Sequence, residues 1–123
     1  MGKEPPMPGA IFNFQTALAN SGDDKEFFSE LVAMFCEDAP EELRALRAEI
    51  ALGNAERSRF HAHTLKGMSG NIGGEILQII ARETEEALRA GDLPAATGRL
   101  TELEEALARL VDALRSAAGG TPA

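Results

Sequence analysis

Residues 61–74 read His61-Ala62-His63-Thr64-Leu65-Lys66-Gly67-Met68-Ser69-Gly70-Asn71-Ile72-Gly73-Gly74 and contain both histidines of the chain together with a cluster of glycines. An α-helix advances by about 100° per residue, so side chains three and four positions apart share one face. Small and apolar side chains follow this spacing at Ser58, Ala62, Leu65, Ser69 and Ile72. The pattern predicts a helix that packs this stripe against a core.

The imidazole of His63 falls on the opposite face of that helix, where we expect it to point to solvent. Arg59, Lys66, Gly67 and Gly70 share this face, because they lie one or two helical turns from His63. The ammonium group of Lys66 would supply a cation for an anionic group carried on the ring. Glycine inside a helix costs about 1 kcal/mol relative to alanine, so we interpret Gly67 and Gly70 as bare backbone that gives a second protein access. The alternative is an ordinary surface histidine near an unwinding helix end.

The run His63-Thr64-Leu65-Lys66-Gly67, followed by Ser69, Gly70, Asn71, Ile72 and Gly73, resembles the signature of histidine-containing phosphotransfer (HPt) domains of multistep phosphorelays. The similarity extends more loosely from about Phe12 to Ala117. It implies that His63 is phosphorylated, that Lys66 contacts the phosphoryl group and that Gly67 gives the partner room. Met68 departs from the family, which usually has serine or alanine there, and this bears on local helix packing.

The composition indicates a single all-α domain. The chain has 123 residues, of which 44% are hydrophobic, enough for one core. Ala, Leu, Glu and Arg dominate, and short connections between helices favour antiparallel neighbours. We therefore expect an antiparallel four-helix bundle with a short N-terminal helical segment across one end. The predicted limits are a disordered tail over residues 1–10, the phosphotransfer bundle over residues 11–117 and a disordered tail over residues 118–123.

Capping residues and prolines predict the bounds of the first helices. A short helical or irregular segment around Phe12–Leu18 precedes a helix whose start is capped by Asp23-Asp24. That helix should end near Asp38, because Pro40 disfavours a helical conformation at Ala39. A separate helix should then begin at Pro40, since proline is tolerated in a first turn.

The later helices are bounded in the same way. Gly53 ends the helix that starts at the proline, and Asn54 caps the helix of the two histidines, which should run to about Asn71. A turn at Gly73-Gly74 leads to the next helix, and Asp92 caps the last one. The last helix has a stripe typical of packed antiparallel bundles, at Leu93, Ala96, Leu100, Leu103, Leu107, Leu110 and Leu114.

The charge and hydropathy of the chain point to protein partners. A formal net charge of −8 and a pI near 4.7 argue against binding to nucleic acid or to an anionic membrane surface. No apolar run reaches the length of a membrane span, and residues 1–9 lack the apolar core of a signal peptide. We therefore expect a cytoplasmic monomer. The lone Cys36 lies in an apolar run and is predicted to be a buried small hydrophobe without a chemical role.

The chemistry expected of His63 is incomplete without a partner. A neutral imidazole has a nitrogen lone pair that can attack phosphorus, but phosphoryl transfer also relies on fixed cations and usually a metal ion. The chain has no nucleotide-binding glycine loop and no acidic cluster around His63 for magnesium. The resemblance implies that a receiver domain of a response regulator, or a hybrid histidine kinase, supplies what is missing. We expect a phosphocarrier with no cofactor, no metal ligand and no ATP-dependent activity of its own.

Four alternatives to a phosphorylated His63 can be weighed. His61 as the acceptor is disfavoured, because it lies about 200° around the helix from His63 and near the core stripe. The same angle argues against the two histidines as joint metal ligands. A helical docking module that is never phosphorylated would use the same exposed face. A free-standing histidine kinase or phosphatase would need an ATP-binding domain or catalytic acids that 123 residues do not show.

Polar residues on the following helix are candidates to support the site. This helix should fold back along the helix of His63, and roughly ten residues beyond the turn it reaches the same level. Arg82 and Glu85 are polar positions near that level, whereas Arg89 lies further off. We hypothesise that Arg82 adds positive charge, or that Glu85 forms a hydrogen bond to the imidazole or to Lys66. Two solvated side chains are the alternative.

Overall fold

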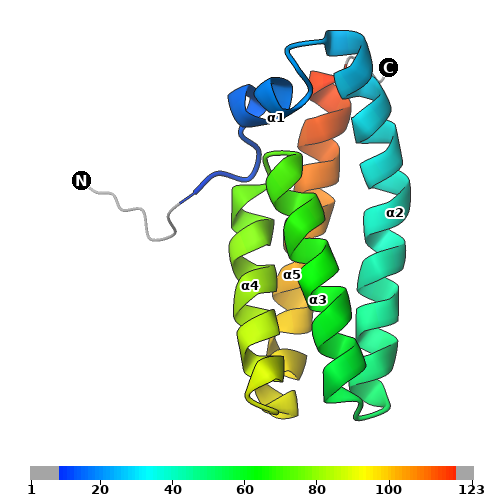
Figure 1. Cartoon of the computed structure of the whole chain (residues 1–123), viewed down its shortest axis with the longest axis vertical. Coiled ribbons are helices and arrows are strands. Elements are labelled where there is room, and N and C mark those ends of the chain that lie inside the picture. Colours follow the sequence, from blue (N-terminus) through cyan, green and yellow to red (C-terminus); the bar gives the residue numbers. More distant parts are fainter. Residues whose placement is uncertain (1–8, 119–123) are drawn as a thin grey trace, which may run out of the picture.

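The computed structural model describes residues 9–118, and every regular element within this part is an α-helix. Residues 1–8 and 119–123, which make up most of the two predicted tails, lie outside it. Helices α2 to α5 alternate in direction and form a four-helix bundle, with α1 across one end (Figure 1). The predicted all-α bundle with a short N-terminal helix is confirmed. The helix bounds are α1 Phe14–Asn20, α2 Lys25–Ala51, α3 Ala55–Asn71, α4 Glu75–Arg89 and α5 Leu93–Ala117.

Apolar stripes of the long helices meet in one core. The stripe predicted for α5 is buried from Ala96 to Leu114, Leu93 at its start is half-buried, and Leu103 and Leu110 are fully enclosed. Asp24, Asn54 and Asp92 each accept a backbone N–H at the start of a helix, as predicted. None of the helices over residues 9–118 is both long and apolar enough to cross a bilayer.

Pro40 lies inside α2, so the predicted helix end near Asp38 and the predicted new helix from Pro40 are wrong. A proline in a helix interior removes a hydrogen bond and costs about 3 kcal/mol. The buried side chains of α2 nevertheless keep their helical spacing across it, with Phe35 and Ala39 before the proline and Leu43 after it. Burial of one large apolar side chain stabilises by about 1.5 to 3 kcal/mol, so an unbroken stripe offsets the lost bond.

The predicted turn at Gly73-Gly74 joins α3 to α4, and both glycines are required by their neighbours. Gly73 has a φ of +83°, and a Cβ there would overlap the carbonyl oxygen of Asn13. A Cβ on Gly74 would overlap the side chain of Leu110 from α5. The missing side chains therefore let two other parts of the chain close onto the turn, which sets the level at which α4 begins.

The segment before α1 is hydrogen-bonded to this turn and to the start of α4. The amide of Asn13 donates to the carbonyl of Gly73 at 2.7 Å, and the amide of Ile76 donates to the carbonyl of Ala10 at 2.9 Å. The amide of Ala10 in turn donates to Oε1 of Glu75 at 2.9 Å. Ala10, which was assigned to the N-terminal tail, is therefore hydrogen-bonded to the start of α4.

Replacement of Gly74 by alanine should destabilise the bundle, because the added methyl group would overlap Leu110. We expect Gly74→Ala to lower the free energy of unfolding by about 1 to 3 kcal/mol, measured by urea denaturation followed by circular dichroism. Gly98→Ala is the matched control, since a Cβ at this exposed position of α5 meets no atom within 4 Å. Gly98→Ala should raise the free energy of unfolding, by about 1 kcal/mol at most, because alanine is the better helix former. Equal midpoints for Gly74→Ala and wild type would contradict this packing.

Candidate functional site

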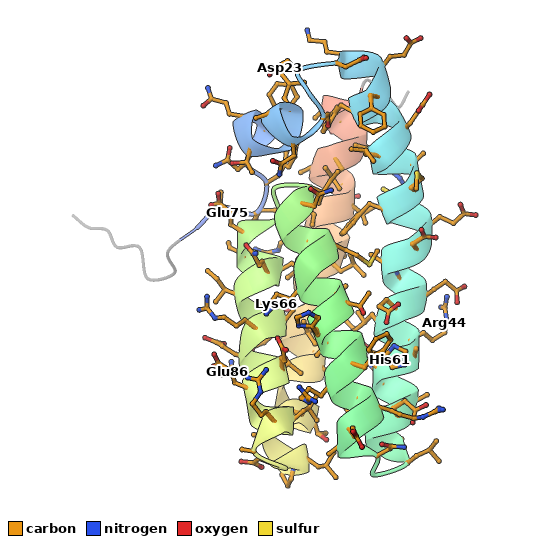
Figure 2. All side chains as sticks on the ribbon, viewed as in Figure 1. Asp23, Arg44, His61, Lys66, Glu75 and Glu86 are labelled. Carbon is orange, nitrogen blue, oxygen red and sulfur yellow. The ribbon has the colours of Figure 1, made fainter. Side chains whose placement is uncertain are left out.

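The two histidines leave α3 on different flanks. The side chain of His63 is 62% exposed and lies on the flank next to α4. His61 is directed toward α2, where its Nδ1 lies 2.5 Å from Oε2 of Glu42. Figure 2 shows the same division, with Lys66 on the side of α4 and His61 on the side of α2. Ala62, between the two histidines, is fully buried in the core. His63 is therefore the histidine that a protein approaching from solvent can reach.

A buried carboxylate on α4 gathers the polar side chains around His63. The side chain of Glu85 is only 4% exposed, and its Oε2 lies 2.8 Å from Nδ1 of His63. Its Oε1 lies 2.9 Å from Nζ of Lys66. A guanidinium nitrogen of Arg89 donates to Oε2 at 3.1 Å. These four residues, His63, Lys66, Glu85 and Arg89, are called the Glu85 cluster below.

The charge state of Glu85 determines which nitrogen of His63 is free. Burial by itself would raise the pKa of Glu85, but the hydrogen bonds and charges of Lys66 and His63 outweigh it and hold the pKa below its ordinary value. The carboxylate is therefore ionised and can only accept hydrogen bonds. Nδ1 of His63 must then carry the proton that it donates to Glu85. In the neutral ring, Nε2 has the free lone pair.

Of the two residues hypothesised to support the site from α4, the structure brings one to His63. Glu85 contacts both the imidazole and Lys66. Arg82 is exposed and has no hydrogen-bond or ion-pair partner among residues 9–118. The positive charge comes instead from Arg89, which was expected to lie further off. Its side chain reaches back one turn along α4 to Glu85. The long side chain of Arg89 makes this contact although its Cα lies further along α4 than the level of His63.

The two glycines predicted to give partner access differ in their surroundings. A Cβ on Gly67 would meet no atom within 4 Å, so the backbone beside His63 is open there. A Cβ on Gly70 would overlap the amide group of Gln78 from α4. The backbone at Gly70 is therefore less open than at Gly67, because the end of the Gln78 side chain fills the space, and partner access at Gly70 stays a prediction. Met68 is half-buried and packs against the core.

Comparison with known proteins relates the whole bundle to phosphotransfer domains. A family model described as the Hpt domain matches residues 30–116. The structure of histidine-containing phosphotransfer protein B from Pseudomonas aeruginosa is 25% identical, with a TM-score of 0.84 over 91% of this chain and 97% of that chain. The HPT domain from an Hpt sensor hybrid histidine kinase from Shewanella shares the fold at 18% identity, with a TM-score of 0.77 over 92% of this chain and 97% of that chain. A sequence comparison with curated proteins found no match.

The stability supplied by Glu85 should depend on pH. Its pKa is lower in the folded chain than the value of about 4.3 expected when unfolded. Its charged contacts therefore contribute fully above that pH, and the contribution is lost as pH falls through the folded-state pKa. We expect Glu85→Gln to lower the free energy of unfolding by about 1.5 to 3 kcal/mol at pH 7. In urea titrations at several pH values, this difference from wild type should shrink below about pH 4.

Glu86→Gln is the matched control, because Glu86 is the neighbouring residue on α4 and is exposed. It should change the free energy of unfolding by less than about 0.5 kcal/mol at every pH. A difference between wild type and Glu85→Gln that stays constant from pH 7 to pH 3 would show that the carboxylate charge is not what stabilises the site.

Proposed function

The chain belongs to the Hpt domain family, and on this premise we propose that His63 carries a phosphoryl group between signalling proteins. The observation that carries the proposal is the 2.8 Å contact between Nδ1 of His63 and the buried carboxylate of Glu85. This contact leaves Nε2 as the free nitrogen of an exposed ring. Lys66 stands beside it as a fixed cation, and Gly67 leaves the adjoining backbone open.

In the proposed reaction, the lone pair of Nε2 attacks the phosphorus of an aspartyl phosphate on the partner. The N–P bond forms as the bond between phosphorus and the aspartate oxygen breaks, and the aspartate leaves as a carboxylate. The ring of His63 gains a positive charge while its Nδ1–H stays donated to Glu85. The buried carboxylate opposes this charge as it develops, and a preorganised group of this kind stabilises a transition state more than water does. Attack by the aspartate oxygen reverses every step.

Lys66 is positioned to contact the transferred group without leaving Glu85 unpaired. Its side chain is 29% exposed, at the solvent edge of the Glu85 cluster. An ammonium group has three N–H donors, so Lys66 can donate to Glu85 and to a phosphoryl oxygen together. If Lys66 turns to the phosphoryl group, Arg89 still donates to the carboxylate. Glu85 therefore keeps a hydrogen-bond donor whether His63 is unphosphorylated or phosphorylated.

The partner that we propose is a receiver domain of a response regulator, alone or within a hybrid histidine kinase. Such a domain would supply the reacting aspartate and the metal ion that neutralises the phosphoryl oxygens. The Shewanella protein similar to this chain is described as an HPT domain of a sensor hybrid histidine kinase, which supports this choice. The chain would then act as a phosphocarrier without ATP-dependent activity of its own. The cytoplasmic location and monomeric state expected from the sequence stay predictions.

The acceptor can be identified by exchanging each histidine in turn. His63→Gln should fold normally but accept no phosphoryl group, because an exposed side chain is replaced by a polar one without the nucleophile. His61→Gln should still be labelled, since its ring faces Glu42 on α2. Phos-tag gels after incubation with a phosphorylated receiver domain would report the label. Labelling of His63→Gln, or its loss in His61→Gln alone, would overturn the assignment.

Lys66→Ala should slow transfer by about 10- to 100-fold, since a hydrogen bond to a charged group contributes about 1.5 to 3 kcal/mol. The rate constant can be measured by quenched-flow sampling of the labelled chain. Arg82→Ala is the matched control, because Arg82 is an exposed cation on the neighbouring helix without a described contact. It should change the rate by less than about twofold. Equal rates for Lys66→Ala and wild type would remove Lys66 from the site.

A further inference from the structure

One large apolar side chain is exposed beside His63. Phe60 is 65% exposed and lies three residues before His63 on α3. A helix rises about 1.5 Å per residue, so the two residues lie within about 5 Å along the axis and on neighbouring positions of one face. The other large hydrophobics exposed in the described part of the chain lie outside α3, at Phe14, Phe27, Met34 and Leu52.

The exposed ring of Phe60 has one aromatic neighbour. It meets the ring of His61 edge to face, with centroids 5.5 Å apart and an interplanar angle of 71°. The ring of His61 is itself fixed by Glu42 from α2. A hollow of about 580 Å³ opens next to it, lined by Asn54, Glu56, Arg57, Phe60 and His61. A partner side chain that enters this hollow would bury part of the exposed aromatic surface of Phe60.

The geometry of transfer places Phe60 under any partner that reaches His63. Phosphoryl transfer requires the reacting atoms to approach to about 3 to 3.5 Å, so the partner must touch α3 at His63. A specific protein interface covers about 800 Å² on each side, which extends beyond one helical turn in either direction. Phe60 lies less than one turn before His63, and the open backbone of Gly67 lies about one turn after it. Both therefore fall inside the contact area.

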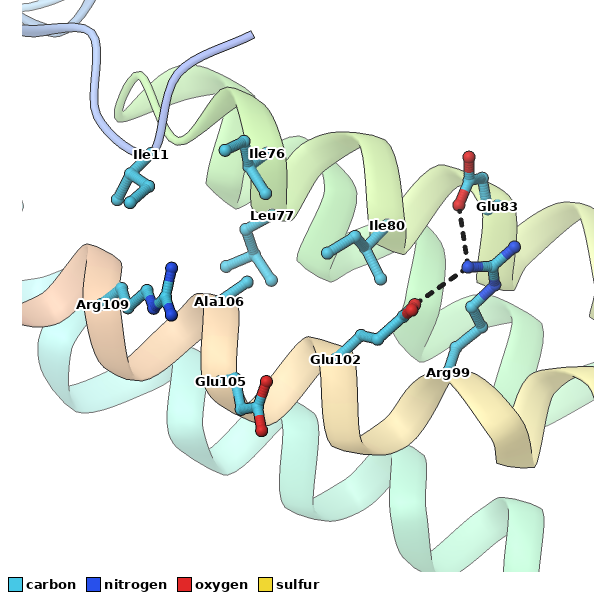
Figure 3. A pocket seen from close by; sticks show the side chains of 10 residues that line it. All are labelled: Ile11, Ile76, Leu77, Ile80, Glu83, Arg99, Glu102, Glu105, Ala106 and Arg109. Atoms are coloured by element: carbon cyan, nitrogen blue, oxygen red, sulfur yellow. Dashed lines mark hydrogen bonds and ion pairs between the residues drawn. The ribbon is translucent and has the colours of Figure 1, made fainter. Parts of the chain in front are cut away.

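Another hollow lies away from this contact area. Figure 3 shows it between α4 and α5, where Arg99 bridges Glu83 at 3.3 Å and Glu102 at 2.9 Å. It has a volume of about 230 Å³, and no residue of α3 lines it. Nothing on its walls connects it to His63, whereas the hollow beside Phe60 adjoins the same face as the nucleophile.

We propose that Phe60 is the docking anchor for the receiver domain, and that it sets affinity without taking part in the chemistry. The inference rests on the proposed function of His63. The occupant is a receiver domain that presents an apolar side chain beside its phosphorylated aspartate. Aromatic residues, Phe among them, are enriched in protein interfaces relative to the rest of the surface, and a few large side chains near the centre supply most of the binding energy. On the other flank of α3, the Glu85 cluster serves the transfer itself, so recognition and chemistry lie on separate sides of His63.

The test compares saturation kinetics of transfer from a phosphorylated receiver domain, selected from response regulators of the same genome because it labels the wild-type chain. Phe60→Ala should raise KM by about tenfold or more and leave kcat within about twofold of wild type. Phe60→Leu should recover part of the affinity. Met34→Ala is the matched control, since it removes another exposed apolar side chain, 56% exposed, from α2. It should leave both constants unchanged.

Each remaining outcome would overturn one defined statement. Failure of every receiver domain to label the wild-type chain would refute the proposed function, and the docking inference would fall with it. An unchanged KM for Phe60→Ala, with wild-type labelling intact, would refute the docking inference alone. A fall in kcat as large as the rise in KM would place Phe60 in the chemistry instead. A wild-type dimer that Phe60→Ala dissociates without a change in KM would make a second copy the occupant, and would also refute the inference.

Discussion

The buried carboxylate of Glu85 is the group on which the site depends. A charge taken out of water is costly, and it persists here because donors from two helices share its oxygens. Lys66 and His63 lie on α3, whereas Glu85 and Arg89 lie on α4. The same contact that stabilises the carboxylate also determines which nitrogen of His63 carries the proton. Stability of the fold and the tautomer of His63 thus depend on one interaction.

That interaction requires α3 and α4 to lie close together at a defined level. α3 packs more extensively against α4 than against any other helix. The buried stripe of α3 contains small residues. The hydroxyl group of Ser69 on α3 donates to Leu65 at 2.7 Å, and that of Thr84 on α4 donates to Ile80 at 2.8 Å, each within its own helix. These polar groups therefore need no partner across the interface. The turn at Gly73-Gly74 then sets where α4 starts, because neighbouring chain segments leave no room for a side chain.

The two flanks of α3 differ in chemistry. The flank next to α4 holds the charged Glu85 cluster, and the flank next to α2 holds Phe60 and the pair of His61 with Glu42. Local helix geometry explains this division, because residues two apart, such as His61 and His63, point in nearly opposite directions. In the function proposed here, the partner docks on Phe60 and reacts with His63, which the Glu85 cluster supports on the flank next to α4.

Local patterns in the sequence were enough to predict the all-α bundle, the caps at Asn54 and Asp92 and the exposed face that carries His63. These features depend on helical periodicity and on hydrogen bonds a few residues away, which each segment encodes by itself. The break predicted at Pro40 failed because burial along all of α2 outweighs a local preference. The choice of Glu85 over Arg82, and the side chain that covers Gly70, were decided only by the tertiary structure. Both depend on how α4 is rotated about its axis, and that rotation is set by packing between helices distant in sequence.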